Sequence, residues 1–271
     1  MAAISRIDNL ALSAIALFLD VDGTLIEIAS RPQAVSVPDD LRGLLRTLYL
    51  ASGGAVALVS GRAIADLDAL FAPLTLPAAG LHGFERRSVS GAYHRRSLPS
   101  AAALESARRA MTHLARRHAG LLVEDKQFAL ALHYRGAPRL EDVVVRAMQD
   151  VAAGLSGDLE LQRGKMVVEL RPNGATKAQA VSAFLEEAPF AGSLPVFIGD
   201  DLTDEPAFEL VNRLEGVSAV VGARRPSAAQ ARLEDVTAVR SWLGQLQGEP
   251  AVALRRLAGA RLRDPSRWSQ G

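Results

Sequence analysis

The 271-residue sequence contains no cysteine. Disulfide bonds, thiolate metal sites and cysteine nucleophiles are therefore excluded, and this composition is typical of a protein in a reducing compartment. We accordingly predict a cytoplasmic location. The length is sufficient for one large domain or two smaller ones, each with its own hydrophobic core.

The sequence also lacks an excess of charge, since 31 basic and 30 acidic residues leave a net charge of +1. This balance gives no global attraction to nucleic acid. No apolar run reaches membrane-spanning length. The short apolar run near the N-terminus ends in "DVDGT" rather than in a small-residue cleavage site, so we predict a strand there and not a signal peptide. Neither a P-loop nor an HExxH motif is present, which excludes P-loop and zinc-hydrolase chemistry.

Short apolar segments alternate with amphipathic ones along most of the chain. We predict strands over Ile15–Leu19, Ala55–Val59, Leu76–Gly80, Leu194–Ile198 and Val217–Val221. We predict helices over Asp39–Leu50, Ala63–Phe71, Thr176–Glu187 and Asp204–Asn212. Near-continuously apolar strands that alternate with helices are typical of a parallel sheet covered on both faces. The predicted fold is therefore α/β, with a Rossmann-like parallel-sheet core whose chemistry gathers at the carboxyl ends of the strands.

The middle of the chain has a different pattern. Helices are predicted over Ala101–Ala119 and Leu140–Ala153, and strands over Leu121–Glu124, Phe128–Tyr134, Leu159–Gln162 and Met166–Leu170. Two helices with a few hairpin-like strands indicate a compact α+β unit inserted into the parallel domain. Prolines interrupt the pattern at Pro99 and Pro172. We therefore place the core domain at residues 1–98 and 173–271 and the inserted cap domain at residues 99–172.

Acidic residues follow two of the predicted strands directly. Asp20 and Asp22 lie in "LFLDVDGTL", and Asp200, Asp201 and Asp204 lie in "FIGDDLTDE". Crowding like charges at the end of a buried strand is unfavourable unless something offsets it. Carboxylate oxygens with no cysteine or histidine nearby suit Mg²⁺. The structural alternatives are an acidic loop at the strand end and, for Asp204, a favourable charge at a helix N-terminus.

Two positions offer the opposite polarity at the same edge of the sheet. Ser60, in "SGR", follows the second strand, where its hydroxyl and the neighbouring amides could hold phosphate oxygens. Lys177 stands at the start of a predicted helix, where a cation is unfavourable unless an anion lies close by. The alternatives are an N-cap serine and a solvated surface lysine.

The order of these motifs resembles that of the haloacid-dehalogenase-type phosphatases and, more closely, of the bacterial trehalose-6-phosphate phosphatases. The resemblance extends from about Phe18 to Trp242 and includes "SGR", "LHGFERR", "FALALHYR", "KMVVELRP" and "VFIGDDLTDE". It implies Mg²⁺-dependent hydrolysis of trehalose 6-phosphate to trehalose and phosphate, the last step of trehalose biosynthesis. One departure is Ala178, which stands where family members often carry glycine after the motif lysine.

The resemblance also implies roles for individual residues. Asp20 would attack phosphorus and form an aspartyl-phosphate. Asp22 would donate a proton to the departing sugar oxygen and then accept one from water. Mg²⁺ would be held by Asp20, the Asp22 backbone carbonyl and Asp200, with Asp204 close by. Further contacts would come from the catalytic residues Ser60 and Lys177 and from Val21, Gly23, Thr24, Gly61, Arg62 and His82.

Substrate choice is expected to come from the inserted unit, because reading sugar hydroxyls requires convergent polar groups. Three predicted strands there each present a polar pair on one face: Glu124 with Lys126, His133 with Arg135, and Glu169 with Arg171. An exposed sheet face with ordinary ion pairs is the alternative. By resemblance, the unit is a cap that closes over the sugar. The residues expected to grip the sugar are Glu124, Lys126, Arg135 and Glu169, with His133 and Arg171 as further candidates.

Other interpretations stay open on the sequence alone. The same core chemistry could serve another sugar phosphate, such as sucrose phosphate. Response-regulator receiver domains also gather acidic residues, a hydroxyl and a lysine at a sheet edge, although they have no inserted cap. An inactive metal-binding relative is a third alternative. We expect a monomer that binds a small-molecule substrate but neither nucleic acid nor membrane, and we leave open an association with trehalose-6-phosphate synthase.

Overall fold

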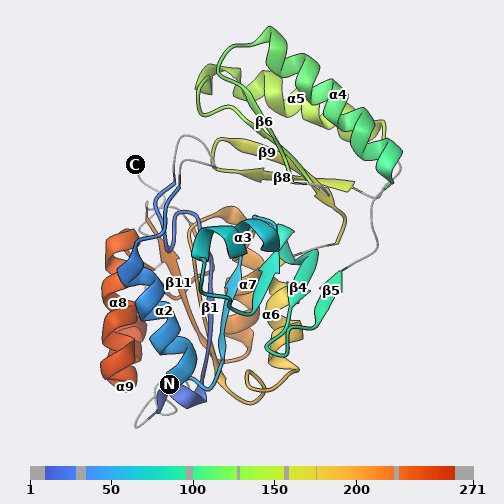
Figure 1. Cartoon of the computed structure of the whole chain (residues 1–271). Coiled ribbons are helices and arrows are strands. Elements are labelled where there is room, and N and C mark those ends of the chain that lie inside the picture. Colours follow the sequence, from blue (N-terminus) through green and yellow to red (C-terminus); the bar gives the residue numbers. More distant parts are fainter. Residues whose placement is uncertain are drawn as a thin grey trace. The chain divides into compact units, whose positions relative to one another are not determined.

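The structure is a computed structural model that describes residues 10–28, 35–95, 100–126, 129–155, 159–174, 176–222 and 226–259. The chain divides into two compact units, a larger one formed by Met1–His94 and Thr176–Gly271 and a smaller one formed by Arg95–Ala175 (Figure 1). Two predictions fall outside the described residues: the domain boundary at residues 98–99, and Phe128 as the start of a strand.

The larger unit is built on an eight-stranded sheet with the order β12-β11-β10-β1-β2-β3-β4-β5. All strands from β12 to β3 pair in parallel, and β4 is antiparallel to β3. The strand bounds are β1 (Ile15–Leu19), β2 (Val56–Val59), β3 (Ala78–Gly80), β4 (Glu85–Arg87), β5 (Tyr93–Arg95), β10 (Leu194–Gly199), β11 (Val217–Val221) and β12 (Ala231–Leu233). The predicted α/β fold class is confirmed, and β4, β5 and β12 are strands that the sequence did not predict.

Helices cover both faces of this sheet. One face carries α2 (Asp39–Ala51), α3 (Ile64–Phe71), α8 (Val236–Gly248) and α9 (Pro250–Gly259), and the other carries α6 (Lys177–Leu185) and α7 (Glu205–Arg213). Short 3₁₀ turns occupy η1 (Leu12–Ala14), η3 (Leu81–Gly83) and η5 (Leu202–Asp204). Among the described residues, no helix combines the length and the apolar character needed to cross a bilayer.

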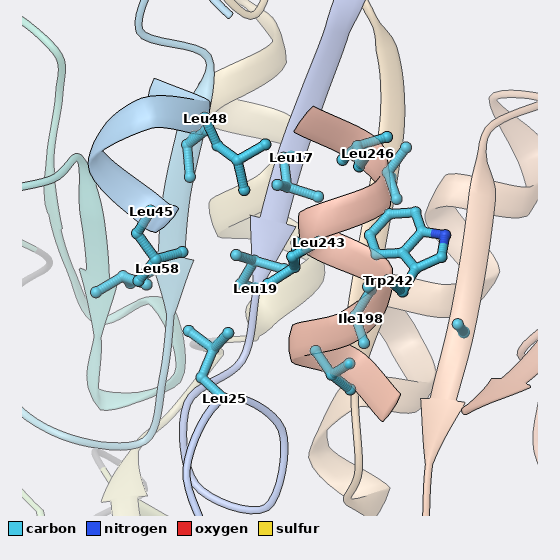
Figure 2. Close-up of a cluster of buried hydrophobic side chains, with 14 of the residues drawn as sticks. Leu17, Leu19, Leu25, Leu45, Leu48, Leu58, Ile198, Trp242, Leu243 and Leu246 are labelled. Carbon is cyan, nitrogen blue, oxygen red and sulfur yellow. The ribbon is translucent and has the colours of Figure 1, made fainter. Parts of the chain in front are cut away.

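The core of the larger unit explains why its strands are apolar throughout. Successive side chains of β1 point to opposite faces. Figure 2 shows one side, where apolar side chains of the sheet meet those of two helices: Leu17, Leu19, Leu58 and Ile198 with Leu45, Leu48, Trp242, Leu243 and Leu246. On the other side Phe18 stacks on Phe190, with ring centroids 5.4 Å apart. A strand buried on both faces needs apolar residues at every position, and its first polar residue therefore marks its end.

The smaller unit has a four-stranded antiparallel sheet with the order β6-β7-β9-β8. The elements are α4 (Ala101–Arg117), β6 (Leu122–Asp125), β7 (Leu130–His133), η4 (Pro138–Leu140), α5 (Glu141–Ala153), β8 (Leu159–Gly164) and β9 (Val167–Pro172). Leu130 and Leu132 pack in a common core with Met111 of α4 and Met148 of α5. The helices thus bury one face of this sheet, and alternation along the strands places the polar residues on the other face.

Candidate active site

The acidic residues of the two strand ends lie together. Leu19, the last residue of β1, pairs with Ile198 of β10 in parallel register. The backbone amide of Asp20 donates to the carbonyl oxygen of Ile198 over 2.9 Å, so Asp20 leaves the sheet beside the end of β10. Carboxylate oxygens of Asp20, Asp200 and Asp204 all lie within 4.8 Å of one another. The pairing of parallel neighbours thus gathers the three carboxylates that the strand-end pattern indicated.

A glycine makes room for this cluster. Gly23 has a φ of +82°, in the left-handed region, and a Cβ at this position would clash with the carboxylate of Asp200. Glycine alone satisfies both the backbone conformation and the close approach. The turn that contains it closes on the carbonyl oxygen of Val21, which accepts from the amides of Leu25 and Ile26. Val21 is fully buried, side chain and backbone alike.

Lys177 supplies the positive charge at the centre of the cluster. Its Nζ donates to Asp20 Oδ1 over 2.7 Å and to Asp204 Oδ1 over 2.6 Å. The lysine side chain is 2% exposed, and the side chains of Asp20 and Asp204 are 6% and 0% exposed. The alternative of a solvated surface lysine is therefore wrong. Two buried carboxylates offset the unfavourable position of Lys177 as the first residue of α6.

One lysine does not neutralise three carboxylates, of which Asp20 and Asp204 are buried and Asp200 is partly buried. Burial raises the pKa of Asp20 to about 7, against the opposing effect of Lys177. Burial and the charges of Asp20 and Asp204 raise the pKa of Asp200 to about 9. Burial alone would lower the pKa of Lys177, but the two carboxylates outweigh it and the pKa is raised. The cluster therefore favours either bound protons or a further cation.

Asp204 is more than a favourable charge at a helix N-terminus. Its Oδ1 accepts from Lys177, and its Oδ2 accepts from the backbone amide of Asp201 over 2.9 Å. Asp201 in turn accepts from the amide of Leu202 and caps η5. Asp204 thus fixes the position of the Lys177 ammonium and of the "GDD" turn at once.

The "SGR" segment lies at the end of β2 in the same unit. Ser60 is buried, and its Oγ accepts from the backbone amide of Arg62 over 3.1 Å. Helix α3 begins after Ala63, whose side chain makes no capping hydrogen bond, so the interpretation of Ser60 as an N-cap is wrong. Arg62 reaches Asp22 with both Nε and Nη2, at 2.6 Å each. The hydroxyl of Thr24, also buried, donates to Asp20 Oδ2 over 3.4 Å.

Glu85, a residue for which the sequence predicted no role, supports the start of the helix that follows "SGR". Glu85 is buried, and its Oε1 accepts from the backbone amide of Ile64, the first residue of α3, over 2.6 Å. The hydroxyl of Tyr93 donates to the other oxygen of Glu85. His82 lies against Gly61, where a Cβ would approach His82 Nε2 to 2.7 Å. The resemblance pointed to "LHGFERR" and to His82, but a single acidic residue in this stretch gave no sign that Glu85 would hold the start of α3.

The polar face of the smaller unit carries most of the predicted sugar-binding residues. Glu124 and Glu169 both pair with Ala131 across the sheet, which places them on the same face. Three ion pairs lie on this face: Lys126 with Glu169 at 2.9 Å, His133 with Glu124 at 2.7 Å, and Arg171 with Glu160 at 2.7 Å. Arg135 lies beyond the end of β7. Glu160 is a member that the sequence did not predict.

The pKa of Glu124 reflects this pairing. Burial by itself raises the pKa of this carboxyl, but the hydrogen bond from His133 and the charge of Lys126 outweigh burial, so the pKa is lowered. Each acidic group on the face therefore has a basic partner. Both interpretations of the face, ordinary ion pairs and a set of polar groups for sugar hydroxyls, agree with this geometry.

Comparison with known proteins places these features in a wider context. A family model described as trehalose-phosphatase matches residues 18–237. A protein of Escherichia coli named trehalose-6-phosphate phosphatase is 46% identical over 226 residues, which are 83% of this chain and 84% of the relative. The resemblance inferred from the motifs is therefore confirmed.

Solved structures agree with this result. The C-terminal domain of a trehalose-6-phosphate phosphatase from C. albicans superposes with a TM-score of 0.80 at 22% identity, covering 91% of this chain and 96% of that one. A trehalose-6-phosphate phosphatase of Aspergillus fumigatus superposes with a TM-score of 0.58 at 26% identity, covering 91% and 97%. At 22% identity, the similarity to the C. albicans structure supports the fold alone.

Proposed function

This chain belongs to the trehalose-phosphatase family, and we propose that it hydrolyses trehalose 6-phosphate to trehalose and inorganic phosphate, the last step of trehalose biosynthesis. The name of the Escherichia coli relative supports this substrate. The observation that carries the proposal is the placement of Asp20, which lies at the end of a buried strand with Lys177 Nζ 2.7 Å from one of its oxygens. The family rules out the receiver-domain alternative.

In the first step Asp20 is the nucleophile. One of its carboxylate oxygens bonds to phosphorus while the bond between phosphorus and the sugar oxygen breaks, which leaves an aspartyl-phosphate. Lys177, fixed by Asp204 at 2.6 Å, keeps its charge beside the transferring group. Because catalysis of phosphoryl transfer depends mostly on positioned charge, a lysine held this way needs no rearrangement during the reaction.

Asp22 handles the protons of both steps. It donates a proton to the departing sugar oxygen, since a sugar alkoxide is a poor leaving group. It then accepts a proton from the water whose oxygen bonds to phosphorus, and the bond between phosphorus and Asp20 breaks to release phosphate. Two displacements through the same carboxylate replace one difficult direct hydrolysis.

The acidic cluster fits a Mg²⁺ ion. It offers three carboxylates whose oxygens lie within 4.8 Å of one another, and hard oxygen ligands of this kind suit Mg²⁺. The raised pKa values of Asp20 and Asp200 indicate that a further cation would relieve repulsion. Asp20, Asp200 and the Asp22 backbone carbonyl would hold the ion, with Asp204 close by. When bound, Mg²⁺ neutralises charge on the phosphoryl oxygens.

Phosphate contacts come from the turns around the cluster. Ser60 offers its hydroxyl at the end of β2. The remaining contacts fall to backbone and side-chain groups of the turns after β1 and β2 and of η3: Val21, Gly23, Thr24, Gly61, Arg62 and His82. Glycine stands at positions 23 and 61 of these turns, and consecutive backbone amides in such turns favour negative charge.

The smaller unit supplies substrate choice in this proposal. We assign it as the cap domain, and its polar face would exchange the ion pairs of Glu124, Lys126, His133 and Glu169 for hydrogen bonds to sugar hydroxyls. Arg135 and Arg171 are the flanking candidates. Charged donors and acceptors give strong discrimination, because an analogue that lacks a hydroxyl leaves them unpaired. We further propose that the protein acts as a cytoplasmic monomer, with or without association with the synthase.

The decisive experiment is a phosphate-release assay on trehalose 6-phosphate with and without Mg²⁺. Sucrose 6-phosphate and glucose 6-phosphate serve as competing substrates. We expect Mg²⁺-dependent release with trehalose 6-phosphate preferred by at least about 100-fold in kcat/KM. Asp20→Asn should abolish turnover with unchanged circular dichroism, and Asp68→Asn, an acidic residue of α3, is its control. Release from sucrose 6-phosphate alone, or full activity in Asp20→Asn, contradicts the proposal.

A further inference from the structure

Arg62 and Asp22 form a bidentate ion pair at the carboxyl edge of the sheet. Nε and Nη2 of the guanidinium each donate to a different oxygen of the carboxylate, both over 2.6 Å. The arginine side chain is 13% exposed and the Asp22 side chain 34% exposed. Two parallel hydrogen bonds of this kind fix the plane of a carboxylate as well as its position.

The backbone that carries Arg62 is itself held on two sides. Its amide donates to Ser60 Oγ over 3.1 Å, and its carbonyl oxygen accepts from the amide of Leu81 over 2.9 Å. The amide of His82 donates to the carbonyl oxygen of Ser60 over 2.9 Å. The backbone of Arg62 is thus fixed by hydrogen bonds. Asp22 lies in a turn and is partly exposed, so its side chain could rotate if Arg62 did not hold it.

We propose that Arg62 is the positioning residue for Asp22. It holds the plane of the Asp22 carboxylate and so sets where this group meets the sugar oxygen and the attacking water. This inference rests on the proposed function, because it assumes that Asp22 moves the protons. It replaces direct substrate binding as the main role of Arg62. A displacement of about 1 Å in a reacting group can cost about 10²-fold in rate, so the loss of Arg62 should have a measurable effect on catalysis.

The two roles of Arg62 predict different kinetics. A group that acts through Asp22 lowers kcat when it is removed and leaves the affinity for the substrate nearly unchanged. A group that binds the substrate directly raises KM. Lysine cannot span two carboxylate oxygens with a planar fork, so Arg62→Lys should retain only part of the effect.

The first experiment measures kcat and KM for trehalose 6-phosphate in Arg62→Met and Arg62→Lys. We expect kcat to fall by about 10–100-fold in Arg62→Met and less in Arg62→Lys, with KM within about threefold of wild type. Arg87→Met is the matched control, because Arg87 forms the same kind of fork with Asp68, at 2.6 and 2.7 Å, away from the acidic cluster. A higher KM with unchanged kcat overturns the proposal.

The second experiment asks whether Arg62 works through Asp22. p-Nitrophenyl phosphate needs little help from an acid in the first step, but hydrolysis of the phosphoenzyme still needs Asp22. We therefore expect Arg62→Met to keep the burst of p-nitrophenol and to slow steady-state turnover. In the Asp22→Asn background, the Arg62→Met change should lower steady-state turnover of p-nitrophenyl phosphate by less than about twofold further. Full additivity of the two changes overturns the proposal.

These measurements separate the inference from the proposed substrate. If wild-type protein releases no phosphate from trehalose 6-phosphate, the proposed function fails. The double-mutant cycle of Arg62→Met and Asp22→Asn, measured on p-nitrophenyl phosphate, still decides the role of Arg62. If the wild type is active on trehalose 6-phosphate and the cycle is additive, the function stands and the inference fails. Arg62→Lys, which keeps the charge, carries the test should Arg62→Met not fold.

Discussion

The two units use charge in opposite ways. At the carboxyl edge of the larger unit, three clustered carboxylates, two of them buried, have one lysine among them, and the pKa values of Asp20 and Asp200 are raised to about 7 and about 9. On the polar face of the smaller unit each acidic group has its own basic partner, as in Lys126 with Glu169 at 2.9 Å. An unbalanced cluster is suited to hold a cation and transfer a charged group. A balanced one is suited to exchange its internal hydrogen bonds for those of a neutral ligand.

The largest expected effect follows from removing the one cation of the unbalanced cluster. Lys177→Met leaves Asp20 and Asp204 buried without their partner, which we expect to cost about 3–5 kcal/mol of unfolding free energy in metal-free protein. The loss of a positioned charge should also lower kcat by at least about 10²-fold. Urea unfolding in EDTA and phosphate release in Mg²⁺ measure the two effects.

The matched variant in the balanced face is Lys126→Met. Lys126 forms an ion pair with Glu169 at 2.9 Å, whereas Lys177 forms two buried ion pairs, with Asp20 and with Asp204. We expect a smaller loss of stability and an effect on KM rather than on kcat. Equal losses of kcat in the two variants would erase the contrast between the units.

The next effect concerns recognition by the smaller unit. Glu169→Ala and Glu124→Ala should each raise KM for trehalose 6-phosphate by about 10–100-fold, because each removes an acceptor and leaves a basic side chain without its partner. Turnover of p-nitrophenyl phosphate should remain nearly unchanged, since a small aryl phosphate has no sugar to read. Kinetics on both substrates test this, and parallel losses on both would count against the cap assignment.

The two units should also respond to pH with opposite signs. Asp20 and Asp200 have pKa values raised above the ordinary value of 3.8, so the folded state binds more protons and metal-free stability falls as pH rises toward about 9. Lys177 stays protonated in both states over this range and adds no slope. Glu124 has a lowered pKa, so its contribution is complete above its ordinary value of 4.5 and is lost as pH falls.

Urea unfolding across about pH 4–9 in EDTA tests this sign difference. Asp200→Asn should flatten the decline on the alkaline side, and Glu124→Gln should flatten the decline on the acidic side. Added Mg²⁺ should raise the melting temperature more at high pH, where it competes with fewer protons. A Mg²⁺ effect that does not depend on pH would argue against the carboxylate cluster as its site.

The sequence predicts the buried strands and the residues at their ends, but not the short strands at the sides of the sheet. The positions of Asp20 and Asp200 follow from one rule, that parallel strands end at a common edge, and the buried strands are apolar without interruption. The short strands β4, β5 and β12 have the sequences "ERR", "YHR" and "ARL" and show no alternation, because pairing with a neighbour makes them strands. Propensity and pattern could not have found them.

The missed residue Glu160 and the missed pairing of Arg62 with Asp22 have the same explanation. Glu160 has Arg171 as its partner because β8 and β9 pair in a particular register, and Arg62 lies opposite Asp22 because β2 lies beside β1. Neither relation is visible in sequence spacing. Lys177 and Asp20 are even farther apart in the sequence. The sequence nevertheless indicated an anionic partner for Lys177, because a lysine at a helix N-terminus is unfavourable without one.

The smallest predicted effect concerns Glu85, a buried carboxylate that belongs to neither pattern. Its Oε1 accepts from the amide of Ile64 over 2.6 Å, at the N-terminus of α3. Glu85→Gln keeps an acceptor but loses the charge, and we expect it to cost about 1 kcal/mol of unfolding free energy, as for the loss of a helix cap.

Tyr93→Phe is the control, because it removes only the hydroxyl that donates to the other oxygen of Glu85. Urea unfolding gives the stability of both variants, and kcat on trehalose 6-phosphate shows whether the loosened helix disturbs "SGR". A loss in Glu85→Gln as large as that in Lys177→Met would mean that this carboxylate belongs to the charge balance of the cluster. A loss of the expected size would mean that Glu85 only holds the start of α3. The charge balance of the acidic cluster would then rest on Asp20, Asp200, Asp204 and Lys177.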